Sequence, residues 1–133
     1  YTRDQAFLAE QGWPIVREAA RFCLAWLVEM PGGTLGTSPS TSPENHFLAP
    51  DGEPAAATVS TTADLVLIRD LFTQVGRLHA ALPAPATEDT VVADRARAAL
   101  TRIPAERIAP DGRIAEWPDD RPDAEPAHRH TSH

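Results

Sequence analysis

The sequence predicts a mainly α-helical fold with long loops and one short hairpin. Apolar residues recur at helical spacing in several stretches, and segments rich in proline, glycine and serine separate these stretches. Near the carboxyl end a strong turn signal, Pro110-Asp111-Gly112, lies between two short apolar segments. Together these observations favour helices that pack against one another and are joined by loops.

The amino-terminal part is expected to contain a short helix followed by a long one. The short helix covers about residues 3–10 and ends at Gly12. Pro14 suits the first turn of the next helix, where its missing N–H is not needed, and this helix is expected to run to about Met30. Its apolar residues follow i, i+4, i+7 and i+8 spacing: Ile15, Ala19, Phe22, Cys23, Trp26 and Met30.

A long connection, about residues 32–60, precedes the second long helix. A loop of this length inside a compact domain is unusual, and such loops are often functional or disordered. The helix is expected to begin near Thr62, with Thr61 and Asp64 as a capping pair, and to end before Pro83. Its apolar positions are Leu65, Ile68, Leu71, Phe72, Val75, Leu78 and Leu82.

The last part of the chain changes from helical to extended patterns. A third helix is expected over about residues 89–103, because acidic residues at its start suit the positive end of a helix dipole. The segments 107–109 and 113–115 flank the turn signal and predict a short hairpin. Residues 118–127 are acidic and rich in proline, which by composition predicts a solvated linker.

The two long helices have apolar faces broader than one small domain needs. Leu24, Leu27 and Val28 widen the first face, and residues 66–67 widen the second. Each helix is therefore expected to contact neighbours on two sides, as in a layered helical assembly. The 133-residue chain starts with tyrosine and ends in a histidine-rich stretch. We therefore expect residues 1–133 to be a single partial domain, with flanking parts elsewhere.

Composition narrows the function classes. The chain has 19 acidic and 12 basic residues and a net charge of −7, so we expect no nucleic-acid partner. No apolar run approaches the roughly 18 residues of a membrane span. The basic residues are all arginine, a bias typical of GC-rich bacterial genomes. The single cysteine, Cys23, is interpreted as a core residue. No cofactor is predicted, because phosphate-loop and dinucleotide motifs are absent from the sequence.

Glu44 is the first candidate catalytic residue. Proline restrains both itself and the residue before it, so Pro39 and Pro43 stiffen the loop that leads to Glu44. Positioned proton transfer requires a carboxylate held by rigid surroundings. The alternative interpretation is an exposed linker rich in serine and proline, in which Glu44 is merely solvated.

Three histidines and a tryptophan are further candidates. His128, His130 and His133 can bind a metal, although no second ligand cluster stands at zinc spacing, and we predict no metal site. Arg129 and His130 can instead bind a ligand rich in hydroxyl groups, or have no role. Trp117 is either a surface for the apolar side of a sugar or a core anchor.

Three motifs follow one another along the chain. They are TSPSTSPEN at residues 37–45, DGRIAEW at residues 111–117 and HRHTSH at residues 128–133. Together they resemble three signatures of glycoside hydrolase family 95, namely the segment around its acid residue, its DG-x-I-x-EW stretch and its HRH-hydrophobic-SH motif. Thr131 departs mildly, since the family prefers a hydrophobic residue there.

The resemblance implies an (α/α)6 barrel and inverting hydrolysis of terminal α-L-fucosyl linkages in oligosaccharides or glycans, or the related α-L-galactosidase activity. By position, Glu44 matches the general acid, whose pKa should be raised by burial or a nearby carboxylate. Arg129 and His130 match the pair that contacts fucose hydroxyls. The base aspartate and the water-positioning asparagines are expected outside this chain, so the chain alone is predicted to be inactive.

A second hypothesis comes from a different class of protein. The chain is then a small helical module that binds a glycan or a protein through Trp117, Arg129 and His130, without catalysis. Compartment and oligomeric state stay open on both hypotheses.

Overall fold

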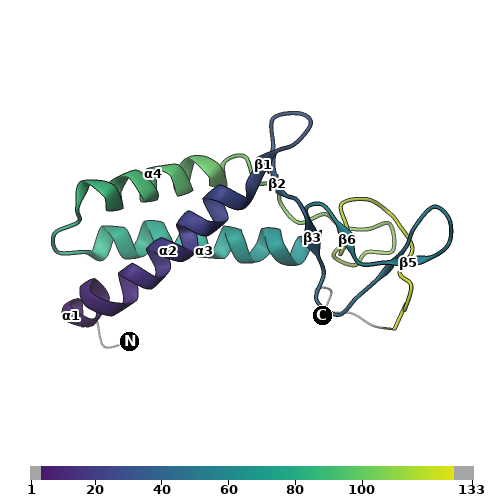
Figure 1. Cartoon of the computed structure of the whole chain (residues 1–133), viewed down its shortest axis with the longest axis horizontal. Helices are drawn as coiled ribbons and strands as arrows, with labels where there is room; N and C mark the ends of the chain where they lie inside the picture. Colours follow the sequence, from purple (N-terminus) through teal and green to yellow (C-terminus); the bar gives the residue numbers. More distant parts are fainter. Residues whose placement is uncertain (1–3, 128–133) are drawn as a thin grey trace.

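The computed structural model describes residues 4–127, and helices and short strands occupy opposite ends of the molecule (Figure 1). The helices are α1 (Gln5–Phe7), the π-helical turn η1 (Leu8–Gly12), α2 (Trp13–Trp26), α3 (Thr62–Ala81) and α4 (Thr87–Leu100). The strands are β1 (Leu27–Glu29), β2 (Leu35–Thr37), β3 (Ser40–Thr41), β4 (Phe47–Leu48), β5 (Pro54–Ala55) and β6 (Ala57–Thr58). The prediction of a mainly helical chain is therefore confirmed.

The hydrophobic core lies between α2, α3 and α4. Phe72 and Val75 of α3 are its most buried large side chains, with at most 1% of their surface exposed. Alanines of α4 face them and leave room for the two helices to run side by side (Figure 1). The other buried members are Trp13, Ala20, Ile68, Val92, Ala93, Ala96, Ala99 and Ile103.

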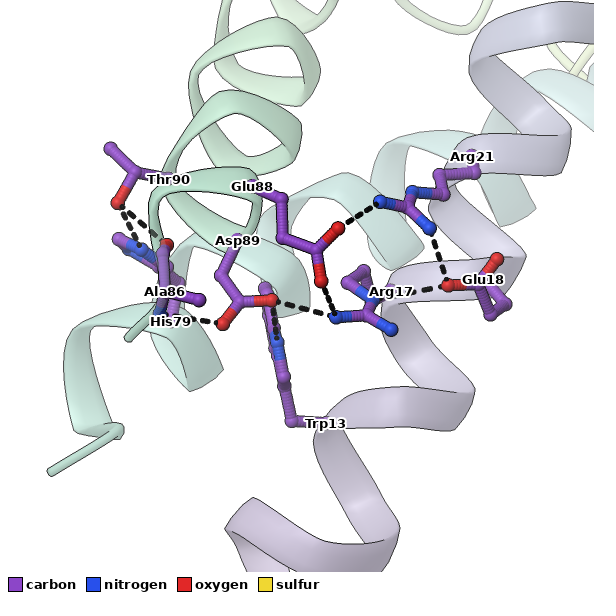
Figure 2. A network of polar contacts seen from close by, with 9 residues as sticks. All are labelled: Trp13, Arg17, Glu18, Arg21, His79, Ala86, Glu88, Asp89 and Thr90. Atoms are coloured by element: carbon purple, nitrogen blue, oxygen red, sulfur yellow. Dashed lines mark hydrogen bonds and ion pairs between the residues drawn. The ribbon is translucent and has the colours of Figure 1, made fainter. Parts of the chain in front are cut away.

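A polar network joins the start of α2 to the start of α4 (Figure 2). Trp13 Nε1 donates to Asp89 Oδ1 at 2.7 Å, and Arg17 Nη1 contacts the same oxygen at 3.0 Å and Glu88 Oε1 at 2.9 Å. The second oxygen of Asp89 accepts from the backbone N–H of Ala86 at 2.8 Å, which caps α4. Burial pushes the pKa of Asp89 upward, but these hydrogen bonds outweigh it, so the pKa lies below its ordinary value.

The chain leaves the helical conformation four residues earlier than the spacing predicted. Helix α2 ends at Trp26 rather than near Met30, and β1 pairs antiparallel with β2. The hairpin is closed by Met30 N, which donates to Thr34 O at 2.9 Å. At the other end Gly12 does not stop the first helix, because η1 leads directly into α2.

Short strand pairs give the connection 32–60 a regular structure. β3 pairs antiparallel with β6, and β4 pairs antiparallel with β5. The β3–β6 pair lies next to the first turn of α3, where Ser40 binds Thr61, whereas β5 lies farther from that helix (Figure 1). The long loop predicted from the sequence is therefore ordered, with backbone hydrogen bonds along much of its length.

The carboxyl-terminal part contacts this same region. The predicted hairpin is present as a bridge between Ile108 and Ile114. Residues 118–127 were expected to be a solvated linker. Most of them are exposed to solvent, as expected, but the segment also pairs with another part of the chain and does not act only as a linker. Leu48 N donates to Pro122 O at 2.8 Å, and Ala124 N donates to His46 O at 2.9 Å, so the segment pairs with the chain around β4.

Large apolar side chains remain exposed on α2 and α3. Ile15 and Phe22 expose 72% and 65% of their surface, and Leu67 exposes 69%. These are the broad apolar faces that the sequence indicated. Within residues 4–127, no helix is both long enough and apolar enough to cross a membrane.

Candidate functional site

Glu44 lies at the tip of a tight turn with an uncommon backbone conformation. Its φ angle is +58°, a left-handed value that few non-glycine residues adopt and that surrounding contacts must hold in place. Asn45 N donates to Ser42 O at 3.4 Å across the turn. Ser42 and Asn45 are buried, at 3% and 2% exposure, while Pro43 and Glu44 are exposed. The turn is thus anchored by buried residues, while Glu44 itself is exposed to solvent.

Hydroxyl groups before the turn bind the first turn of α3. Ser40 Oγ donates to Asp64 Oδ2 at 2.5 Å, and Thr37 Oγ1 donates to the same oxygen at 3.3 Å. Thr61 N donates to Ser40 Oγ at 2.9 Å, and Thr61 Oγ1 donates to Thr41 O at 3.2 Å. The predicted capping of α3 by Thr61 is wrong, because its hydroxyl makes no cap hydrogen bond. The side chains of Thr61 and Asp64 instead bind the loop that leads to Glu44.

Glu116 binds the turn from the other side. Ser42 Oγ donates to Glu116 Oε1 in a short, buried hydrogen bond, and Glu116 is 5% exposed. Thr62, the first residue of α3, fixes this segment, since its N donates to Glu116 O at 3.1 Å and its Oγ1 donates to Ala115 O at 2.5 Å. The amino-terminal turn of α3 therefore holds both the Glu44 loop and the Glu116 segment.

Trp117 packs beside the same turn. It is 3% exposed, and its ring meets Phe47 edge to face, with centroids 5.0 Å apart. Its Nε1 donates to Asp123 Oδ1 at 3.1 Å, and the Arg121 guanidinium carbon lies 4.1 Å from the centroid of the Phe47 ring. Within the described residues Trp117 is thus an anchor, and its contact with a sugar stays a prediction.

An open, mostly apolar groove lies beside Pro43, the residue before Glu44. Its lining residues include Pro43, Ala63, Val66, Leu67 and Ile114. The groove extends from Pro43 along the exposed side of the first turns of α3, where Val66 and Leu67 lie.

The other predicted binding residues lie outside the described part of the chain. Arg129 and His130 fall beyond residue 127, and so do the candidate metal ligands His128 and His133. Within residues 4–127, no three His, Cys, Asp or Glu side chains gather as a metal site.

Comparison with known proteins agrees with the motifs. Residues 1–133 match the family model of the glycosyl hydrolase family 95 catalytic domain. The chain belongs to glycosyl hydrolase family 95. This family 95 chain is 40% identical over 133 residues to Alpha-L-fucosidase 2 of Arabidopsis thaliana. The match covers 100% of the chain but 15% of that relative, so the family 95 chain spans about one seventh of the length of the curated relative.

Two partners of the loop that carries Glu44 were missed from the sequence, namely Asp64 as a hydroxyl acceptor and Glu116 as the acceptor for Ser42. A signal for Glu116 was present. It is an acidic residue directly before Trp117 in a segment otherwise suited to burial, and it lies within the DGRIAEW string that resembled the family.

Proposed function

We propose that this chain is one section of the catalytic domain of an inverting α-L-fucosidase and that Glu44 is its general acid. One observation carries the assignment. In a chain of family 95, the carboxylate of Glu44 is exposed on a turn between Ser42 and Asn45, which are both buried and hydrogen-bonded. The relative named Alpha-L-fucosidase 2 supports the choice of sugar.

In this mechanism Glu44 gives its proton to the glycosidic oxygen while the bond to the anomeric carbon breaks. A base on the opposite face of the sugar removes a proton from the attacking water, so the configuration at the anomeric carbon inverts. Arg129 offers two parallel N–H donors, and with His130 it orients the fucose hydroxyl groups. We assign the base and the water-positioning amides to parts of the domain outside these 133 residues.

A general acid must be protonated before it acts, which favours a site shielded from water. Glu44 is exposed within the described chain. We infer that other parts of the domain shield Glu44 from water. The exposed apolar side chains of Ile15, Phe22 and Leu67 support this inference, because they offer surfaces on which those parts can pack. Two-sided burial of α2 and α3 is what an (α/α)6 barrel of paired helices would produce.

The test uses the complete catalytic domain that contains this chain, assayed on a fucosylated oligosaccharide. Glu44→Gln should lower kcat by roughly 10²–10⁴-fold, the usual contribution of a general acid, while the circular dichroism spectrum is unchanged. Glu53→Gln, an exposed carboxylate on the same connection, is the matched control and should retain activity. Retained activity in Glu44→Gln would remove Glu44 from the acid role.

Two further measurements test the finer parts. Proton NMR of the first product should show β-L-fucose from an α-L-fucoside, and initial release of the α-anomer would contradict inversion. Parallel assays on α-L-galactosides decide between the two sugars. The 133-residue chain alone should release no fucose, and turnover by it would contradict the partial-domain proposal.

A further inference from the structure

We propose that Glu116 and Trp117 form a clamp that fixes the turn of Glu44 from both sides and so sets the direction in which the acid delivers its proton. This Glu116–Trp117 clamp rests on the proposed role of Glu44. Both residues are buried, at 5% and 3% exposure, so they act as positioning residues rather than through contact with the substrate.

The first contact of the clamp lies before Glu44. Ser42, two residues earlier in the chain, donates its hydroxyl hydrogen bond to Glu116 Oε1. A hydrogen bond to a carboxylate is stronger than one between neutral groups. Because both partners are buried, water competes poorly for either group. The bond therefore restrains the backbone where it enters the left-handed conformation at Glu44.

The second contact lies after Glu44. Phe47, three residues later, packs edge to face against Trp117, a geometry that aromatic pairs prefer. Backbone pairing of Phe47 with Asp123 reinforces the contact, because Asp123 also accepts the Trp117 indole N–H. The chain therefore leaves the turn along a fixed path.

The clamp is attached to a rigid element. Thr62 binds the backbone oxygens of Ala115 and Glu116 from the first residue of α3. The same helix carries Ile68 and Phe72 into the core. Displacing the turn thus requires breaking contacts with α3, so the backbone that carries Glu44 is held in place.

Loss of the positioning of Glu44 has a specific kinetic consequence. An alcohol leaving group of a glycan departs only with a proton, whereas dinitrophenolate departs as a stable anion. Loss of positioning should therefore slow cleavage of the glycan and spare cleavage of a dinitrophenyl fucoside. A general loss of folding would slow both equally.

The experiment measures kcat and KM of the complete domain on both substrates. Ser42→Ala and Glu116→Ala should each lower kcat on the oligosaccharide roughly 10- to 100-fold and change dinitrophenyl fucoside cleavage less than about threefold. The double variant should be no slower than Glu116→Ala, because the two groups form one bond. Glu116→Gln retains an acceptor oxygen and should recover most of the rate. Equal losses on both substrates, or no loss on either, would overturn the clamp.

Asp89→Asn is the matched control. Asp89 is a carboxylate of similar burial, 6% exposed, but it joins α2 to α4, so the variant should lower stability without changing the ratio of the two rates.

Amide hydrogen exchange gives a readout independent of activity. In Glu116→Ala, exchange should accelerate over residues 40–47 and stay unchanged in α4. Unchanged exchange over 40–47 contradicts the clamp, whereas a wild-type domain that cleaves no fucoside contradicts only the proposed function.

Discussion

Trp13 donates its indole N–H to the carboxylate of Asp89 at 2.7 Å, although 76 residues separate the two in the chain. Asp89 also caps α4 through the backbone N–H of Ala86 and pairs with Arg17. One buried carboxylate thus defines both the start of α4 and its attachment to α2. Asparagine in its place retains the shape but loses the charge, which makes the contribution of the charge measurable.

Asp89→Asn should lower the stability of the domain at pH 7, and the difference from wild type should shrink in acid. The pKa of Asp89 is below its ordinary value in the folded protein, where Trp13, Ala86 and Arg17 stabilise the charged form against the effect of burial. The stabilisation is therefore complete above the ordinary value of 3.8 and is lost as the pH falls through the lower folded value. Thermal unfolding between pH 7 and pH 3 measures this. A difference that does not depend on pH would contradict it.

Gly36→Ala should destabilise the domain by about 1–3 kcal/mol, the usual cost of overpacking. A Cβ at this position of β2 would overlap Ser60 Oγ and lie 2.9 Å from Met30 Cγ. The control is Gly76→Ala in α3, where a Cβ meets nothing within 4 Å, and alanine should stabilise the helix by about 0.5–1 kcal/mol. Denaturant unfolding should give shifts of opposite sign for the two variants.

Phe22→Ala should destabilise the complete domain by several kcal/mol, although Phe22 is 65% exposed within this chain. The proposed neighbouring helices cover this face of α2, and removing a covered phenylalanine typically costs about 3–5 kcal/mol. Arg97→Ala on α4, whose side chain is 70% exposed, is the control and should change little. An unchanged melting temperature in Phe22→Ala would mean that no neighbour packs on α2 there.

The helices were predictable because apolar spacing is a local property of the sequence. The residues at which the helices end were less predictable. The apolar run continues from α2 into β1, and spacing alone does not show that Leu27 pairs with Thr37 across a hairpin. Asp64 stands where a capping residue is expected, yet the hydroxyls of Ser40 and Thr37 bind its carboxylate. In both cases a tertiary partner outweighed the local preference.

The turn that carries Glu44 was predictable only in part. The two prolines indicated a stiff loop, and the structure gives Glu44 a left-handed backbone conformation between buried Ser42 and Asn45. Its partner Glu116 lies 74 residues beyond Ser42, and no local spacing encodes that distance. The pairing of residues 118–127 was missed because composition describes side chains. Their contacts with the chain around β4 use backbone groups, as between Leu48 and Pro122, and any polar segment can form these.

The separation of Ser42 from Glu116 also orders events during synthesis. At about 5–20 residues per second the ribosome needs roughly 4–15 s to add the 74 residues between them. Helices α2, α3 and α4 are all complete by residue 100, so the nascent chain can assemble its helical core before the clamp emerges. The hydrogen bond between Ser42 and Glu116 therefore forms after these helices, and a chain truncated before Glu116 would retain its helices without that contact.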